Sequence, residues 1–306
     1  MNQKHNRYHE PPFTRQILEY AEVAENGNLV DLYGGVASYG VALLSEYPKL
    51  RYWYFDIDDE ALDTAKERLE RFGARAKIKR INARDLDRRM TEEGLSEIDC
   101  AIYDPGLRRG HVENPQRGFL TKYPGPLDGR YDRAHGVTIS EIVNTESVEV
   151  LSDILNLVGM PFSFRLARAI VESRAETPIS STRELSEIVS KAFPFRARRK
   201  RVPPEVLVML ALRIHVNDEF EALREAVRKG FKALRTGGRL VTISYHSGEA
   251  RIYKVFARQH DERYADENEK KLRVLTRKAL KPSDDEIAQN PLIRSAQLRV
   301  YEKLKI

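Results

Sequence analysis

Asp104-Pro105-Gly106-Leu107, a tetrapeptide about a third of the way along the chain, has residue types suited to chemistry on a weakly nucleophilic amine. The exocyclic amine of a nucleobase is such a group, because its lone pair is delocalised into the ring. A carboxylate and a backbone carbonyl that accept hydrogen bonds from its two N–H groups favour a pyramidal nitrogen and stabilise the positive charge that develops there. The Asp104 side chain and the Pro105 carbonyl could fill these roles. The alternative is a Pro-Gly turn that carries an exposed aspartate.

Other glycine and acidic positions, each after an apolar run, suit an adenosine-containing cofactor. Gly34-Gly35 lets a ligand approach the backbone without meeting a Cβ. Asp56, 21 residues after Gly35, could accept hydrogen bonds from ribose hydroxyls, and Asp85 could reach an adenine edge. Each feature alone is common in turns and helix caps, and Asp58 or Asp59 could be such a cap. Together, and in register with predicted strands, they indicate an adenosine-cofactor site.

The apolar runs before these residues predict strands of a parallel sheet. Short apolar runs alternate with helical periodicity, which is typical of strand–helix–strand units with right-handed crossovers. Ligands bind outside the carboxyl ends of such strands, where the residues above are expected. We expect strands at 29–32, 51–55, 77–81 and 98–103, and helices at 36–44 and 59–72.

The alternation stops after Leu107, and the next stretch lacks a convincing strand. It predicts a helical insertion domain over 107–204, between core segments 1–106 and 205–306. The expected fold class is α/β, with a Rossmann-like, mostly parallel core and a helical insertion. Further elements are expected as short helical stretches around 139–157, 164–173 and 182–192, a long helical pattern, straight or bent, over 205–234, helical sequence to about 259, and strands at 239–245 and 296–304.

Two classes of adenosine-containing cofactor are candidates for the site predicted at the carboxyl edge of the sheet. A nicotinamide dinucleotide needs a GxGxxG turn whose helix N-terminus holds a pyrophosphate. The stretch from Gly34 to Gly40 reads GGVASYG and does not match that turn. S-adenosylmethionine carries no phosphate and tolerates a looser loop, and the closing strand suits the extra edge strand of methyltransferases. We therefore favour S-adenosylmethionine.

The positive charges of the chain are clustered rather than numerous. The formal net charge is only +6 over 306 residues, yet 196–201 holds five cations in six positions, and Arg108-Arg109 adds two more. The run is either a solvated loop or a phosphate contact, because clustered cations release counterions from a polyanion. We favour RNA contact through Arg108, Arg109, Arg196, Arg198, Arg199, Lys200 and Arg201.

Composition excludes several other classes. The single cysteine, Cys100, excludes an intramolecular disulfide and a cysteine-cluster zinc site, and we predict no metal. Its place inside an apolar strand argues against the accessible thiolate that carbon-5 methylation needs. No apolar run approaches the roughly 20 residues of a membrane span, and the N-terminus has no secretory pattern. We expect a soluble, cytoplasmic protein.

Motifs that lie in a fixed order along nearly the whole chain are the most specific signal. They occupy 9–12, 117–119, 125–132, 167–172, 212–219, 243–247 and 290–299. In these stretches the chain resembles the MraW/RsmH family of small-subunit ribosomal RNA methyltransferases, which modify a cytidine at N4. The tetrapeptide at Asp104 also resembles the Asp/Asn-Pro-Pro-aromatic loop of amino methyltransferases.

The chain departs from this family at the first loop, where Ala37 and Ser38 stand in place of glycines and Tyr39 in place of histidine. By position, His111 stands where the family has a cofactor-contacting glutamine. His246 could contact the target base or an RNA phosphate, or it could cap the following helix. The resemblance implies a catalytic set of Asp104, Pro105 and His246, and a cofactor-binding set of Gly35, Ala37, Ser38, Tyr39, Asp56, Asp85, Asp104 and His111.

The resemblance implies an S-adenosylmethionine-dependent transferase that adds one or two methyl groups to N4 of an unpaired or flipped cytidine in small-subunit (16S-type) rRNA. Its partner is then that rRNA or the small ribosomal subunit. The altered glycine loop motivates an alternative, a non-catalytic RNA-binding or ribosome assembly factor derived from such an enzyme. Retention of Asp56, Asp85 and Asp104 favours the enzyme. A nicotinamide-dependent oxidoreductase, the third hypothesis, lacks its phosphate loop.

Overall fold

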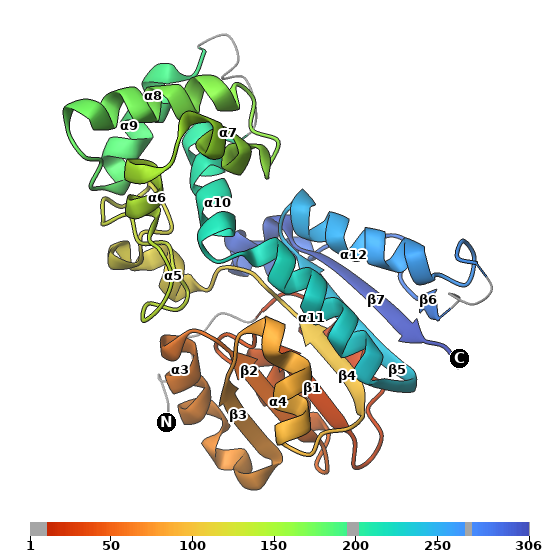
Figure 1. Ribbon diagram of the computed structural model, residues 1–306. Helices are drawn as coiled ribbons and strands as arrows, with labels where there is room; N and C mark the ends of the chain where they lie inside the picture. Colours follow the sequence, from red (N-terminus) through yellow and green to blue (C-terminus); the bar gives the residue numbers. More distant parts are fainter. Residues whose placement is uncertain (1–10, 195–201, 267–270, 306) are drawn as a thin grey trace. The chain divides into compact units, whose positions relative to one another are not determined.

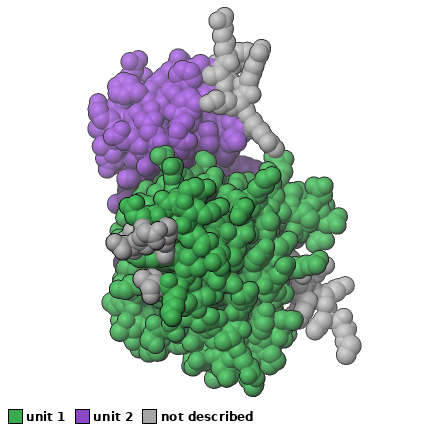
Figure 2. Space-filling model, turned by 90° about the vertical axis from the view of Figure 1, so that its right-hand side faces the viewer, with its two compact units in different colours: residues 1–106, 220–306 green, residues 107–219 purple. Residues whose placement is uncertain are grey.

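The computed structural model describes residues 11–194, 202–266 and 271–305, and the chain divides into two compact units. Unit 1 is built from residues 1–106 and 220–306, and unit 2 from the intervening residues 107–219 (Figure 2). The chain thus returns to the core at 220 and not at the expected 205. The reason is α10 (Pro204–Val216), whose buried Val208 and Leu212 belong to the apolar core of unit 2.

Unit 1 contains a seven-stranded sheet with the order β3-β2-β1-β4-β5-β7-β6 (Figure 1). Neighbours from β3 to β5 are parallel, and β7 is antiparallel to both β5 and β6. The Rossmann-like, mostly parallel fold class is confirmed. The strands are β1 (Asn28–Leu32), β2 (Arg51–Asp56), β3 (Ala76–Arg80), β4 (Ile98–Tyr103), β5 (Leu234–Ser244), β6 (Leu272–Val274) and β7 (Gln297–Lys303).

Helices cover both faces of this sheet because its central strands are apolar on both sides. Every residue of β4 is buried. One apolar cluster joins the sheet to α4, α11 and α12 through residues such as Leu223, and a second joins it to α1, α2 and α3 through residues such as Leu43. The helices are α1 (Thr14–Tyr20), α2 (Ser38–Glu46), α3 (Asp59–Leu69), α4 (Leu86–Glu92), α11 (Glu219–Ala233), α12 (Ser247–His260) and α13 (Asp284–Gln289).

Unit 2 is helical, as the sequence predicts. Its described residues, 107–194 and 202–219, contain no extended strand, only an isolated bridge between Pro126 and Ser181. Its helices pack around one apolar cluster that includes Ile139, Leu166 and Leu185. With α10 they are α5 (Arg109–Glu113), α6 (Ile139–Thr145), α7 (Val148–Asn156), α8 (Ser163–Glu176) and α9 (Thr182–Ala192).

Two predicted helices end earlier than expected. The helix expected over 205–234 is interrupted between α10 and α11, where Asp218 takes a left-handed φ of 48°. The helix expected over 59–72 ends at Leu69, and a 3-10 turn follows over Glu70–Arg75, with Gly73 at φ 54°. A left-handed residue cannot continue a right-handed helix. Within the described part of the chain, none of the helices is both long and apolar enough to cross a bilayer.

Candidate functional site

The carboxyl edge of the parallel strands collects the residues that the sequence singled out. In the strand order, β1 lies between β2 and β4, so the loops after β1 and β4 flank the topological switch point of the sheet. Gly34 and Gly35 follow β1, and Asp56 ends β2. Asp85 lies in the loop after β3, and Asp104 directly follows β4. Unit 1 therefore presents a glycine loop and three acids along one edge.

The loop after β1 is fixed by contacts from β2. The Gly35 N–H donates to Asp56 Oδ2 at 3.0 Å, and the Tyr54 hydroxyl donates to the Gly35 carbonyl at 2.7 Å. Gly34 packs against the same ring, and a Cβ on it would lie 2.4 Å from Tyr54 Cε2. A larger residue at Gly34 would have to displace the tyrosine that holds the loop.

The altered part of this loop keeps a conformation that glycine favours. Ala37 has φ 56°, in the left-handed region, which costs alanine roughly 1 kcal/mol and glycine almost nothing. The Arg68 guanidinium of α3 donates to the Val36 carbonyl at 2.5 Å and to Ser38 Oγ at 2.9 Å. Contacts from α3 thus order the loop where the chain lacks glycines. Sequence reasoning missed Arg68, whose position on a charged helix carries no distinguishing pattern.

Asp56 and Asp85 differ in how firmly they are held. Asp56 also accepts the Asp58 N–H at 2.9 Å through Oδ1, and Asp58 caps α3 by accepting the Glu60 N–H at 2.9 Å. Of the two caps that the sequence allowed, Asp58 and Asp59, the structure has Asp58. Asp85 is 45% exposed in its side chain and lies 3.5 Å from an Arg88 nitrogen. Asp56 is preorganised by backbone donors, whereas Asp85 is accessible to solvent.

Asp104 is a shielded carboxyl group and not an exposed turn residue. Its Oδ1 is buried and accepts no hydrogen bond from any described residue. The Tyr39 hydroxyl lies 3.4 Å from its Oδ2. Burial raises the pKa of Asp104 to about 7; the charge of Glu249 adds to the rise, and polar contacts with Tyr245, Tyr39 and the Gly106 backbone oppose it. Near neutral pH this group can exchange a proton.

Asp31, in β1, is a fully buried acid, and sequence reasoning did not select it as a site residue. Its side chain is fully buried and accepts a hydrogen bond from the Tyr52 hydroxyl, while Oδ1 has no partner in the described part of the chain. Burial raises its pKa to about 8, and the charges of Asp104 and Asp56 also raise it, against the Tyr52 hydrogen bond. An acid inside an otherwise apolar strand was the signal that could have found it.

His246 stands at the start of α12 and faces an acid of the same helix. Glu249 Oε2 accepts the N–H groups of Tyr245 at 2.7 Å and of His246 at 3.3 Å. His246 Nε2 lies 3.1 Å from Glu249 Oε1. His246 therefore occupies the N-cap position of α12, as one of its two sequence interpretations has it. Contact between His246 and a base or phosphate stays a prediction.

The remaining predicted residues lie in unit 2 or outside the described residues. His111 is buried between the rings of Phe119, 4.7 Å away, and Tyr131, 5.2 Å away, and its Nδ1 accepts the Arg108 N–H at 3.2 Å. It therefore belongs to an aromatic cluster of unit 2, and its contact with the cofactor stays a prediction. Arg109 pairs with Glu113 on the surface. The predicted RNA contacts Arg196, Arg198, Arg199, Lys200 and Arg201 lie outside the described residues.

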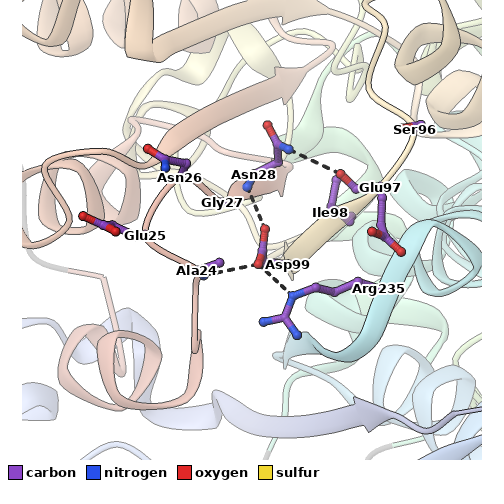
Figure 3. Close-up of a pocket in the computed structure, with 10 residues that line it drawn as sticks. All are labelled: Ala24, Glu25, Asn26, Gly27, Asn28, Ser96, Glu97, Ile98, Asp99 and Arg235. Atoms are coloured by element: carbon purple, nitrogen blue, oxygen red, sulfur yellow. Dashed lines mark hydrogen bonds and ion pairs between the residues drawn. The ribbon is translucent and has the colours of Figure 1, made fainter.

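The opposite edge of the sheet carries an open pocket of about 480 Å³ at the amino ends of β1, β4 and β5 (Figure 3). Asp99 accepts the Asn28 N–H at 2.8 Å and the Ala24 N–H at 3.2 Å, and Arg235 Nε donates to it at 2.8 Å. The Asp99 carboxylate thus binds the turn before β1 and the Arg235 side chain of β5. We interpret this pocket as a structural feature of the sheet edge.

The carboxyl edge has the chemistry of a site for a cationic adenosine cofactor. Asp31 and Asp104 each keep one buried oxygen without a partner among the described residues. A cation bound beside these two acids would favour their ionised forms and be attracted by them, whereas a pyrophosphate would be repelled by the same charges. S-adenosylmethionine carries a sulfonium and an ammonium group and no phosphate, so the residues present fit it. The fold and the site together define the class of Rossmann-like methyltransferases.

Comparison with known proteins specifies the family. The chain belongs to the MraW methylase family, whose model matches residues 6–304, and its methyl donor is S-adenosylmethionine. A ribosomal RNA small subunit methyltransferase H from Coprothermobacter proteolyticus is 36% identical over 96% of both chains, and one from Thermotoga neapolitana is 34% identical over 98% of this chain and 97% of its own. Among solved structures, an rRNA methylase from Streptococcus thermophilus is similar over 95% of this chain and 94% of its own, with 12% identity and a TM-score of 0.42.

Proposed function

We propose that the protein transfers one or two methyl groups from S-adenosylmethionine to N4 of a cytidine in small-subunit ribosomal RNA. The observation that carries this proposal is Asp104, a carboxyl group at the switch point with one buried oxygen left without a partner among the described residues. The names of the relatives, each a ribosomal RNA small subunit methyltransferase H, support the choice of RNA.

In this proposal Asp104 and Pro105 act on the amine. The Asp104 carboxylate and the Pro105 carbonyl accept hydrogen bonds from the two N–H groups of the amine. The nitrogen lone pair then leaves conjugation with the ring and points at the methyl group. A carboxylate with a pKa of about 7 can then take the proton that the amine loses and pass it to water. His246, at the start of α12, contacts the target base or a phosphate.

The cofactor is held along the carboxyl edge. Asp56 accepts hydrogen bonds from ribose hydroxyls and Asp85 reaches the adenine edge, while Asp31 and Asp104 attract the positively charged end. The sulfonium supplies an electrophilic methyl group and makes the thioether a good leaving group. The loop after β1 contributes its backbone and side chains through Gly35, Ala37, Ser38 and Tyr39, and His111 contributes from unit 2.

Unit 2 recognises the RNA. Its cations Arg108 and Arg109, together with the run at 196–201, neutralise phosphates and make binding depend on salt. The target cytidine must be unpaired or flipped, because a base stacked in a helix cannot reach the Asp104 carboxyl.

The alternative is a non-catalytic RNA-binding or ribosome assembly factor. The glycine loop motivated it, yet Ala37 keeps the left-handed φ that a glycine would provide there. Gly35 is held by Asp56, and Asp104 is shielded. A glycine-like backbone at Ala37, together with the shielded oxygen of Asp104, favours an enzyme over a non-catalytic factor.

The test is methyl transfer to small ribosomal subunits that lack the modification, with labelled S-adenosylmethionine and mass spectrometry of the nucleosides. We expect label in N4-methylated cytidine. The Asp104→Asn variant should lose roughly 10²–10⁴-fold in rate, the usual contribution of a positioned acid or base. Asp63→Asn, which changes an exposed aspartate paired with Lys66, is the matched control and should keep the wild-type rate.

Other outcomes would separate the hypotheses. Label in a different nucleoside would keep the cofactor and reject cytidine N4. Tight binding to subunits without measurable S-adenosylmethionine affinity would reject the enzyme in favour of the assembly factor.

A further inference from the structure

The two helices that flank β5 in the chain, α11 and α12, lie side by side on one face of the sheet (Figure 1). At their starts the rings of Phe220 and His246 are 5.8 Å apart, and in their second halves the rings of Phe231 and Phe256 are 5.2 Å apart. Since the starts meet and the later turns meet, the helices run parallel. Their outer sides therefore form one continuous surface of unit 1.

This surface carries five cations that have no acidic partner in the described part of the chain. On each helix the buried residues, such as Leu223 and Tyr253, face the sheet, and the exposed cations recur at every third or fourth position. We call the five residues the α11–α12 cationic face. They are Arg228 and Lys232 of α11 and Arg251, Lys254 and Arg258 of α12.

The acids of the two helices do not compensate this face. In α12 the single acid, Glu249, is buried, so the exposed side of that helix holds none. In α11, Glu221 pairs with Arg224, and Glu225 pairs with Lys229. The positive charge of the α11–α12 cationic face is therefore left without a counter-charge on its own helices.

Other helices of this chain compensate their exposed arginines. Each of four such arginines pairs with a glutamate four residues further along: Arg88 with Glu92, Arg109 with Glu113, Arg168 with Glu172 and Arg183 with Glu187. Pairs of this kind stabilise a helix, whereas like charges at the same spacing destabilise it. The helix dipole favours Lys232 and Arg258, which lie in last turns, but not Arg251 or Lys254. Helix stability therefore does not account for the cationic face.

We propose that the α11–α12 cationic face binds the phosphate backbone of the substrate RNA. This inference rests on the proposed function, and it adds a surface of unit 1 to the RNA contacts proposed for unit 2. Clustered cations without partners attract a polyanion and release its condensed counterions. Because α12 starts at the carboxyl end of β5, the face begins at the edge of the sheet that holds Asp104.

The spacing and the side-chain types favour RNA as the occupant. Arg251 and Arg258 are seven residues apart, which is about 10 Å along a helix, and Lys254 lies between them. That distance equals about three phosphate intervals along one strand of a double helix. Neither helix exposes a large aromatic side chain on which a base could stack. We therefore expect contacts with phosphates, independent of base sequence.

The experiment measures affinity for naked 16S-type rRNA and for small ribosomal subunits that lack the modification, at salt concentrations between about 0.05 and 0.2 M. Two double variants test the two helices. One is Arg251→Gln/Lys254→Gln in α12, and the other is Arg228→Gln/Lys232→Gln in α11.

The matched control is Lys49→Gln/Lys66→Gln, which removes the same amount of charge. Both lysines are exposed, and each pairs with an acid, Lys49 with Glu25 and Lys66 with Asp63. Urea unfolding of every variant checks the fold. The test variants should be as stable as the wild type or slightly more so, because like charges are removed from exposed helix positions.

With one phosphate for each cation, a test variant should lower the slope of log affinity against log salt by about 1.4–1.8, since each lost contact removes about 0.7–0.9. At about 0.1 M salt its affinity for the rRNA should fall roughly 25- to 60-fold, because each contact contributes a factor of about 5–8 relative to 1 M salt. The control should keep the wild-type slope.

Three outcomes would overturn the inference. The first is a wild-type slope in both test variants. The second is an equal decrease in the control, which would make the effect one of net charge. The third is a loss of affinity for subunits but not for naked rRNA, which would assign the face to a ribosomal protein. Absence of methyl transfer by the wild type would instead reject the proposed function, and the salt dependence of RNA binding would still test this surface.

Discussion

Replacement of Asp99 should destabilise unit 1 far more than replacement of its ion-pair partner. The Asp99 side chain is 8% exposed and accepts two backbone N–H groups, those of Asn28 and Ala24 (Figure 3). In Asp99→Ala each donor loses its partner in a partly buried setting, at about 1 kcal/mol or slightly more apiece. Arg235 is about one-third exposed, so its share is at most about 1 kcal/mol. The expected loss is about 3 kcal/mol.

Urea unfolding followed by tryptophan fluorescence measures this loss directly. Trp53, the only tryptophan in the chain, lies in β2 with its Nε1 3.3 Å from Asn28 Oδ1, so it reports on the strand that Asp99 supports. With a slope of about 2–3 kcal/mol/M, the midpoint should fall by about 1 M. Arg235→Ala, the control, should shift it by a third of that or less.

The reasoning would be refuted by an Asp99→Ala cost below about 1 kcal/mol, or by an equal cost in Arg235→Ala. The first result would mean that the turn before β1 does not depend on its acceptor. The second would mean that the ion pair outweighs the backbone bonds. Affinity for S-adenosylmethionine should stay at the wild-type value in both variants, because Asp99 lies at the amino edge of the sheet and the predicted site at the carboxyl edge.

Three further predictions concern the carboxyl edge and the core. Because burial raises the pKa of Asp104 to about 7 and the ionised form is the active one, the methyl-transfer rate should rise with pH through neutrality and be half-maximal near that value; a profile flat through this range would contradict it. Ala37→Val should cost about 1–2 kcal/mol in urea unfolding and weaken S-adenosylmethionine binding in calorimetry, because a β-branched residue resists φ 56°, while Ala37→Gly should be nearly neutral. Cys100 is fully buried, which raises the pKa of its thiol, so it should resist alkylation until the protein unfolds, and Cys100→Ala should keep full activity.

The sheet and the edge residues could be predicted because they depend on local patterns. An apolar run such as Ile98–Tyr103 predicts a buried strand, and the position of a polar residue after the run places it at the carboxyl edge. The Asp58 cap follows from the same local chemistry. The short strand β6 and the short helices α1, α4, α5 and α13 were missed, because their few residues carry no period that stands out.

The contacts between distant segments could not be predicted. That Tyr39 approaches Asp104, or that Arg68 reaches Val36 and Ser38, depends on tertiary packing which brings separate elements together. The end of unit 2 was misplaced for the same reason. The apolar positions of α10 show that it is buried, and only packing shows which core buries it.

The discontinuity of unit 1 has a consequence for its synthesis on the ribosome. β4, buried at every residue in the folded protein, pairs with β5 on one side, and residues 107–219 must be translated before β5. At 5–20 residues per second this leaves an apolar strand without that neighbour for on the order of 10 s. An exposed apolar edge is a template for aggregation. Early folding of unit 2, or a chaperone that covers the nascent sheet, would protect the chain during that interval.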